Sequence, residues 1–196
     1  MRNNNNPIYL EGKLVLITGA SSGIGRACAV ECGNMGAKLI LLGRNKERLE
    51  ETLRMIENKE RHLVCQVDIT EFEKVENIVK DSVSLLGRIS GLINCAGIST
   101  TSPFNMVKPE RLEEFFKTNV AGAVNLTRTV VRQSNFSMEG GSVIFIGSVM
   151  GEVGEVGKSV YSITKGALIS GTKSLALELA QRNIRVNCIS PGVVET

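Results

Sequence analysis

Residues 13–25 read KLVLITGASSGIG: an apolar run, a glycine-rich turn and the start of an amphipathic stretch. This order of strand, turn and helix suits a pyrophosphate, because glycines let the backbone come close and the helix start offers free N–H groups. A glycine-rich turn alone is a weak signal for a nucleotide, but here its context is met. The spacing is G-x-x-x-G-x-G instead of the more usual G-x-G-x-x-G. We therefore predict a nucleotide site at this turn.

The rest of the chain continues the alternation of short apolar runs and amphipathic stretches. The apolar runs are typical of buried parallel strands, and the stretches between them are typical of helices. Six strands separated by five helices, with right-handed crossovers, predict a Rossmann-like, doubly wound α/β sheet in one domain, with strand order 3-2-1-4-5-6. The predicted strands are Lys13–Thr18, Lys38–Leu42, Leu63–Val67, Leu92–Asn94, Val143–Gly147 and Val186–Ile189. The predicted helices are Ile24–Met35, Lys46–Asn58, Glu71–Leu86, Glu110–Gln133 and Ser159–Arg182.

Composition narrows the classes of protein. The 196 residues carry a net charge of +3, and no basic run is interleaved with aromatics, so we expect no nucleic-acid partner. The apolar runs are far too short to span a membrane. Polar residues 3–6 stand where a signal peptide needs an apolar stretch, so we expect a cytoplasmic protein. We assign residues 1–11 to a flexible tail and 12–196 to the domain.

The cysteines and the histidine give no metal or hydrolase pattern. The five cysteines are scattered and form no C-x-x-C pair, so we expect no metal site and interpret them as buried free thiols. His62 is the only histidine, and no nucleophile elbow accompanies it. A Ser-His-Asp hydrolase is therefore discounted.

The end of the second predicted strand bears on cofactor choice. An acidic side chain commonly stands here when a site prefers NAD, because it binds the ribose 2′-hydroxyl. This chain has Gly43 and Arg44 instead, and an arginine can hold a 2′-phosphate. The alternative is a solvated arginine at a helix start, where its charge opposes the helix dipole. A bound anion explains Arg44 better, and we predict NADP(H) as the cofactor.

Tyr161 and Lys165 are spaced i, i+4, so both side chains lie on one helical face. A lysine charge about 4 Å away stabilises an ionised phenol by about 4 kcal/mol at an effective dielectric near 20. That is enough to bring the hydroxyl into acid–base range. Such a pair is common on helix surfaces and gains force only beside the glycine turn and Ser148. The loop 147–159 between Ser148 and this helix holds four glycines, and we interpret it as a ligand-binding loop in preference to a tolerant surface loop.

Taken together, these motifs resemble the short-chain dehydrogenase/reductase family. The likeness covers Gly12 to Thr196, and the glycine spacing matches the compact subtype. The stretch from Ser148 to Thr196 is most similar to 3-oxoacyl-acyl-carrier-protein reductases. The motifs that carry the resemblance occur in the family's order: TGASSGIG, Asn94-Cys95-Ala96-Gly97, Asn119, Ser148, Tyr161-x-x-x-Lys165 and Pro191-Gly192…Thr196.

The resemblance implies roles for the matching residues. Tyr161 would protonate the substrate oxygen and Ser148 would polarise it. Lys165 would favour the ionised phenol and hold the nicotinamide ribose, and Asn119 would bind a water that links Lys165 to solvent. Asp68 would meet the adenine amino group, Asn94 and Gly97 would line the cofactor, and Thr196 would contact the carboxamide. The full expected cofactor set is Gly19, Ser21, Ser22, Gly23, Ile24, Gly25, Arg44, Asp68, Ile69, Asn94, Ala96, Gly97, Tyr161, Lys165, Pro191, Gly192 and Thr196.

Two features depart from the family pattern. The usual Asn-Asn-Ala-Gly has a cysteine at its second position, Cys95, which keeps a small side chain but loses an amide. Family members also run on for several tens of residues past the position of Thr196. We expect that substrate-covering helical segment and last strand to be absent from residues 1–196, and most of the specificity pocket with them.

The resemblance leaves three functions open. The first is an NADP-dependent carbonyl reductase with a 3-oxoacyl thioester as substrate; the second is a dehydrogenase for a sugar, polyol or steroid-like alcohol. The third is a catalytically silent cofactor-binding protein, which the intact set of Ser148, Tyr161, Lys165 and Asn119 argues against. A carrier-protein partner is in doubt, because Arg182 fits the family's basic helix ends but residues 137–139 do not. The resemblance also implies a homodimer or homotetramer through the helices at 110–133 and 159–182.

Overall fold

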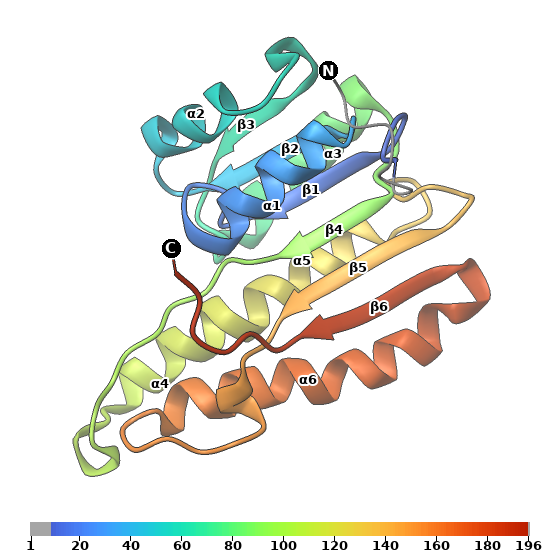
Figure 1. The fold of residues 1–196 in the computed structure, drawn as a ribbon. Helices are drawn as coiled ribbons and strands as arrows, with labels where there is room; N and C mark the ends of the chain where they lie inside the picture. Colours follow the sequence, from blue (N-terminus) through green and yellow to red (C-terminus); the bar gives the residue numbers. More distant parts are fainter. Residues whose placement is uncertain (1–8, 196) are drawn as a thin grey trace.

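The computed structural model describes residues 9–195, and these form one parallel sheet with helices on both faces (Figure 1). The six strands stand in the order β3-β2-β1-β4-β5-β6, which confirms the predicted order. Every neighbouring pair is parallel. The strands are β1 Leu14–Thr18, β2 Lys38–Gly43, β3 Leu63–Gln66, β4 Gly91–Asn94, β5 Gly141–Ile146 and β6 Ile184–Ile189.

The helices are divided between the two faces of the sheet. Helices α1 (Gly23–Asn34) and α2 (Lys46–Arg54) cover one face, while α3 (Phe72–Leu86), α5 (Ala123–Val130) and α6 (Ser159–Leu179) cover the other (Figure 1). The short α4 (Pro109–Phe115) leads into α5 and lies against α6. All crossovers therefore keep the sheet buried between two layers of helices.

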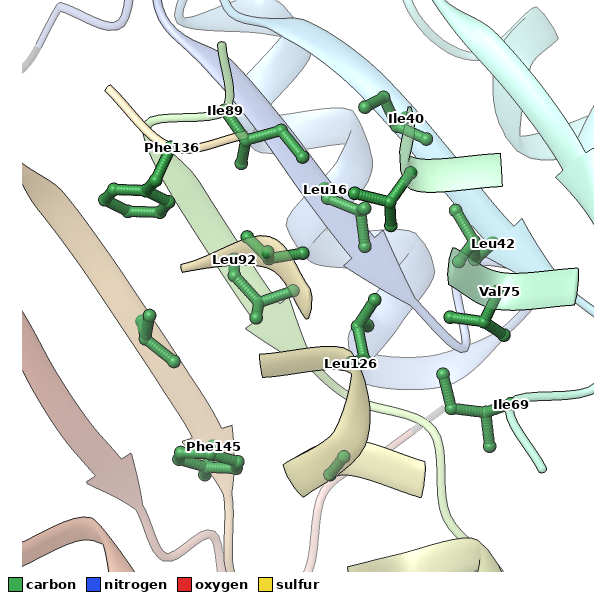
Figure 2. Close-up of a cluster of buried hydrophobic side chains, with 14 of the residues drawn as sticks. Leu16, Ile40, Leu42, Ile69, Val75, Ile89, Leu92, Leu126, Phe136 and Phe145 are labelled. Carbon is green, nitrogen blue, oxygen red and sulfur yellow. The ribbon is translucent and has the colours of Figure 1, made fainter. Parts of the chain in front are cut away.

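Strand β1 lies at the centre of the sheet and shows why its sequence is apolar throughout. All five of its residues are buried. Leu14 and Leu16 pack into the cluster under α3, α5 and α6, whereas Val15 and Ile17 pack into the cluster under α1 and α2. Figure 2 shows the first cluster, with Leu16 beside side chains from both flanking strands. A strand covered on both faces has no polar alternation, which explains the continuous apolar run in the sequence.

Two predicted helices differ from the observed ones. The helix predicted at Glu110–Gln133 is interrupted by a π-helical turn at Phe116–Gly122, and α5 ends at Val130. The π turn contains Asn119, whose side chain is bonded to the backbone of residue 98. The helix predicted at Lys46–Asn58 ends at Arg54, and Asn58 takes a left-handed conformation (φ 53°) that stops a helix.

The sheet order creates a cleft at its carboxyl edge. The chain leaves β1 for β2 on one side, and later returns to place β4 on the other side of β1. Loops that follow β1 and β4 therefore diverge, and ligands of such sheets bind where they part. Both the glycine turn after β1 and the loop after β4 begin at this point.

At the start of the described chain, Leu10 is attached to the domain. Its N–H donates to the Met35 carbonyl at 3.0 Å, and its side chain packs against the cluster under α1. Residues 1–8 of the predicted tail lie outside the described residues. Within residues 9–195, no helix is long and apolar enough to cross a membrane.

Candidate active site

The glycine turn after β1 has a backbone that only glycine can supply at two positions. Gly19 has a positive φ of 65°, and a Cβ there would lie 3.0 Å from the Ala96 nitrogen. A Cβ on Gly25 would lie only 2.3 Å from the Gly19 carbonyl oxygen. The turn therefore folds tightly back on helix α1, and the first N–H groups of α1 face out of the sheet edge. Ser22, the N-cap of α1, makes no capping bond with its side chain, so these donors are left for a ligand.

A cavity of about 600 Å³ opens above this turn, at the carboxyl ends of β1, β2 and β4. It gathers the predicted residues Gly19, Ser21, Ser22, Gly23, Ile24, Gly25, Arg44, Asp68, Ile69, Ala96 and Gly97. Residues that sequence reasoning did not assign to the cofactor also line it, namely Thr18, Leu42, Gly43, Asn45, Arg48, Val67, Cys95, Ile98, Ser99, Thr118 and Ile146. The volume, the glycine backbone and the free helix N-terminus together fit a dinucleotide.

The end of the cavity beside β2 is positively charged. Arg44 is largely exposed, and its Nη1 lies 4.0 Å from Oδ2 of Asp68. An exposed pair at this distance is weak, so the arginine is available to another anion. Arg48, one turn into α2, brings a second guanidinium to the same cavity. The signal that could have found Arg48 is its spacing of four residues from Arg44.

Asp68 is held in its ionised form. Burial acts to raise the pKa of its carboxyl, but the backbone and side-chain hydrogen bonds from Thr70, together with the Arg44 charge, lower it below the usual value. The Thr70 N–H donates to Asp68 Oδ1 at 2.8 Å. The carboxylate is therefore an acceptor fixed at the rim of the cavity.

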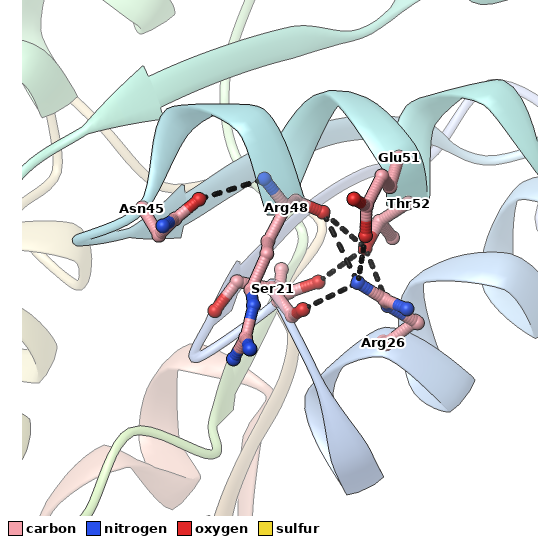
Figure 3. A network of polar contacts seen from close by, with 7 residues as sticks. Ser21, Arg26, Asn45, Arg48, Glu51 and Thr52 are labelled. Atoms are coloured by element: carbon pink, nitrogen blue, oxygen red, sulfur yellow. Dashed lines mark hydrogen bonds and ion pairs between the residues drawn. The ribbon is translucent and has the colours of Figure 1, made fainter.

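The turn and helix α2 are tied together by Arg26 (Figure 3). Its guanidinium donates to the Ser21 carbonyl at 2.7 Å and to Thr52 Oγ1 at 3.0 Å, and pairs with Glu51 at 3.1 Å. Thr52 in turn donates to the Ala20 carbonyl at 2.8 Å. Arg26 thus spends its charge on structure, whereas the Arg48 guanidinium in Figure 3 extends away from this network, beside Ser21.

The loop after β4 is fixed to its neighbours by two side chains. Thr18 Oγ1 accepts the N–H groups of Cys95 and Ala96, both at 3.0 Å. Asn119 Oδ1 accepts the Ile98 N–H at 2.7 Å, and its Nδ2 donates to the Ile98 carbonyl and to Thr164 Oγ1. Asn119 is therefore already engaged with protein partners, and its predicted role as a water ligand stays a prediction.

Lys165 is buried between the two long segments of the site. Its Nζ donates to the Ile146 carbonyl at 2.6 Å and lies 5.6 Å from the centre of the Tyr161 ring. A Cβ on Gly97 would stand 3.6 Å from this Nζ and 3.3 Å from Asn119 Oδ1, so the structure brings three predicted residues together. Burial lowers the pKa of Lys165 below its usual value, and the thiols of Cys188 and Cys95 act in the opposite direction.

Ser148 and Tyr161 approach from either side of the loop 147–159. Ser148 is buried, and its Oγ accepts the Met150 N–H at 3.1 Å, which leaves its own proton free to donate. The 3₁₀ turn that follows it presses on α6, because a Cβ on Gly151 would lie 2.8 Å from the Gly166 nitrogen. Tyr161 lines a second cavity of about 340 Å³ with Thr100, Val107 and neighbouring residues.

Some predicted cofactor residues lie away from the larger cavity's lining. Asn94 is buried, and its amide donates to Thr127 Oγ1 on α5 while its Oδ1 has no partner among the described residues. Pro191 accepts the Val149 N–H at 3.1 Å, and the space around Gly192 is open. Figure 1 shows the chain after β6 turning back across the carboxyl ends of the strands. Thr196 lies outside the described residues.

A doubly wound sheet with this glycine turn and this cavity defines an α/β protein that binds a dinucleotide. The family model for the short chain dehydrogenase matches residues 13–196, and the chain belongs to this family. The resemblance drawn from the sequence is thereby confirmed. Its members are oxidoreductases that interconvert CH–OH and C=O groups with a nicotinamide cofactor.

Individual relatives share about a third of their residues with this chain. Carbonyl reductase family member 4 of Danio rerio is 35% identical over 184 residues, 94% of this chain and 76% of that protein. The 3-oxoacyl-acyl-carrier-protein reductase of Thermotoga maritima is 36% identical over 192 residues, 95% of this chain and 76% of that protein.

Solved structures superpose closely on the fold. A dehydrogenase/reductase of Sinorhizobium meliloti aligns with a TM-score of 0.91 at 32% identity, covering 96% of this chain and 75% of that one. An NAD⁺-bound xylitol dehydrogenase aligns with a TM-score of 0.88 at 32% identity, covering 95% of this chain and 72% of that one.

Proposed function

We propose that this chain is an NADP-dependent carbonyl reductase whose preferred substrate is a 3-oxoacyl thioester. The observation that carries the proposal is the buried Lys165 ammonium beneath the ring of Tyr161, at the rim of a cavity next to the dinucleotide cavity. A buried cation beside a tyrosine favours loss of the phenol proton, which is the event that acid–base catalysis at this position needs.

Three side chains divide the work on the substrate oxygen. When bound, the reduced nicotinamide supplies the hydride. Tyr161 gives its phenol proton to the carbonyl oxygen, and Ser148 donates a hydrogen bond to the same oxygen. Ser148 suits this role because its Oγ already accepts the Met150 N–H, so its proton points elsewhere. Lys165 is held by the Ile146 carbonyl and stabilises the phenolate that remains.

The preference for NADP rests on Arg44. It lies at the end of β2 in the cavity wall, and Gly43 leaves no carboxylate there to repel a 2′-phosphate. Arg48 lines the same region and supports the assignment. Asp68 is the nearest competing charge, but its Oδ2 is 4.0 Å from Arg44, too far for a strong pair.

The substrate class rests on the second cavity and on the relatives. Its lining combines apolar side chains such as Met106, Val107 and Val160 with the hydroxyls of residues 100–102, which suits an acyl chain with a polar head. Two relatives are named for 3-oxoacyl-acyl-carrier-protein reduction. The likeness to a xylitol dehydrogenase favours a polyol or sugar substrate as the second candidate.

We also propose a homodimer or homotetramer through α4, α5 and α6. Apolar side chains are exposed on this layer, including Val124, Ile163 and Leu177. Gly171, in the middle of α6, faces open space, as do Ser170 and Ser174 on the same surface. Small residues that do not pack against their own chain permit close approach of a second helix. Light scattering at micromolar concentration that found only monomer would oppose this assembly.

A substrate screen tests the proposal. Oxidation of NADPH and of NADH is followed with 3-oxoacyl thioesters, ketoses and ketosteroids, with the Tyr161→Phe variant as a control for background turnover. We expect the highest kcat/KM for a 3-oxoacyl thioester with NADPH. A higher value for a ketose would favour the second candidate, and no turnover above the variant's background with any substrate would refute the proposed activity.

A further inference from the structure

Two cysteines from distant parts of the chain meet beside the dinucleotide cavity. Cys28 lies on α1 and Cys95 follows β4, and their thiols are hydrogen-bonded to each other. Both side chains pack against the cluster under α1 and α2. Neither is fully buried, so the interpretation of these two as inert core thiols does not describe them.

Cys95 is part of the cavity wall. It lines the cavity next to Thr18 and Ala96, and its N–H group is bonded to Thr18 Oγ1. The backbone of residues 95–96 also approaches the glycine turn closely, because a Cβ on Gly19 would lie 3.1 Å from the Cys95 carbonyl carbon. A displacement of Cys95 is therefore transmitted directly to the turn that receives the pyrophosphate.

We propose that Cys28 and Cys95 form a redox modification site, at which a hydroperoxide converts the two thiols to a disulfide that weakens dinucleotide binding. The cavity gives small molecules access to Cys95, and a bound dinucleotide would cover it. The other cysteines are not partners of this kind: Cys65 and Cys188 pack on the opposite face of the sheet.

The chemistry requires only a peroxide as oxidant. The Cys28 thiolate attacks one peroxide oxygen, the O–O bond breaks, and a sulfenic acid and one water are formed from hydrogen peroxide. The Cys95 sulfur then attacks the Cys28 sulfur, the S–O bond breaks, and hydroxide leaves with the Cys95 proton as a second water. Two thiols have lost two electrons to the peroxide, and a dithiol reductant reverses the reaction by exchange.

The environment identifies Cys28 as the attacking thiol. The hydrogen bond from Cys95 lowers the pKa of the Cys28 thiol to about 7, against a smaller opposing effect of burial. The bond to Cys28 and burial raise the pKa of Cys95, although the Lys165 charge acts the other way. Cys32, one helical turn from Cys28, has its pKa raised to about 11 by burial and by the charges of Cys28 and Glu31. Only Cys28 is thus substantially a thiolate near neutral pH.

The test compares the wild-type chain with Cys28→Ser and, as a matched control on the same helix, Cys32→Ser. Each protein is treated with hydrogen peroxide, and the disulfide is mapped by mass spectrometry after cleavage at Glu31, which separates Cys28 from Cys32. Affinity for NADPH and NADH is measured by fluorescence before and after treatment. Because this readout is binding alone, it does not depend on the proposed substrate.

We expect a disulfide between residues 28 and 95 in the wild type and in Cys32→Ser, with affinity about tenfold or more weaker because the turn is displaced. The reductant should restore affinity, and prior addition of NADPH should slow the reaction. Cys28→Ser should bind normally and keep its affinity in peroxide. Absence of the 28–95 disulfide in the wild type, or unchanged affinity in the fully oxidised protein, would overturn the proposal.

Discussion

The two cavities at the carboxyl edge of the sheet are built in different ways. The larger one is formed mostly by a continuous segment, the turn 18–25, and by the ends of neighbouring strands. The smaller one beside Tyr161 is formed by three separate segments, residues 100–102, 106–111 and 157–161. The first kind of site is encoded locally and is shared widely among proteins of this fold. The second depends on how loops meet, and that is where relatives with different substrates diverge.

The largest expected effect separates the two cavities by chemistry. Tyr161→Phe removes the proposed proton donor but keeps the ring, so kcat should fall by about 100-fold or more. Affinity for NADPH should change little, because Tyr161 is not among the residues lining the larger cavity. Steady-state kinetics on the best substrate of the screen gives the answer, and near-parental turnover would show that Tyr161 is misassigned. Tyr9→Phe, at the chain's other and exposed tyrosine, is the control.

The sequence predicted most of the fold because its decisive signals are local. Each strand is a short buried run, and each lies within a few residues of its predicted bounds; β5 begins at Gly141, two residues before the prediction. The π turn in the helix predicted at 110–133 could not be read in the same way. It accompanies the bonds between Asn119 and Ile98, which join parts of the chain that have no sequence relation.

The same distinction applies to the site. The glycine turn, Arg44 and the Tyr161–Lys165 pair were found from spacing, and their functional roles stay predictions. Arg48 and the Cys28–Cys95 pair were not found, because each depends on a contact between separate elements. Asn94 matched a family motif, yet its side chain is turned to Thr127 in the core.

The next effect sharpens the account of the larger cavity. A charge-assisted bond from Arg44 to a 2′-phosphate contributes about 1.5–3 kcal/mol, which is roughly 10- to 150-fold in affinity. Arg44→Asp should therefore reverse the preference, because it repels the phosphate and offers an acceptor to the ribose hydroxyl of NAD. Fluorescence titration with NADPH and NADH measures the ratio. Arg54→Asp makes the same charge change at the far end of α2, outside the cavity lining, and should leave the ratio unaltered. Equal affinities in the parent would contradict the assignment.

Glycines in the two regions should respond differently to alanine. Gly25→Ala places a methyl group 2.3 Å from the Gly19 carbonyl oxygen, and relief of such overpacking costs about 1–3 kcal/mol of unfolding free energy. Dinucleotide affinity should fall with it, because the turn must move. Gly154→Ala, in the loop on the substrate side, has nothing within 4 Å of the new methyl group. Urea denaturation should find this second variant as stable as the parent; comparable losses in both would mean that the close contact at Gly25 is relieved at no cost.

The smallest effect concerns the arginines that brace each region. Arg26→Ala removes the bonds to the Ser21 carbonyl and Thr52 and the pair with Glu51. At about 0.5–1.5 kcal/mol per net hydrogen bond, and with Glu51 half-exposed, the loss should be about 1–2 kcal/mol of unfolding free energy. Because the Ser21 carbonyl belongs to the glycine turn, NADPH affinity should fall several-fold as well.

Arg182→Ala is the matched change on the other side of the sheet, where the side chain donates to the Val131 carbonyl at 2.6 Å. It should cost about 1 kcal/mol of unfolding free energy, yet leave NADPH affinity unchanged, because residue 182 follows the far end of α6 and does not line the cavity. Stability and affinity should thus fall together for Arg26 and separately for Arg182. Denaturation and titration on the same preparations decide the matter. If both variants lost stability and neither lost affinity, Arg26 would brace the helices alone, and the turn would hold its shape through its own backbone.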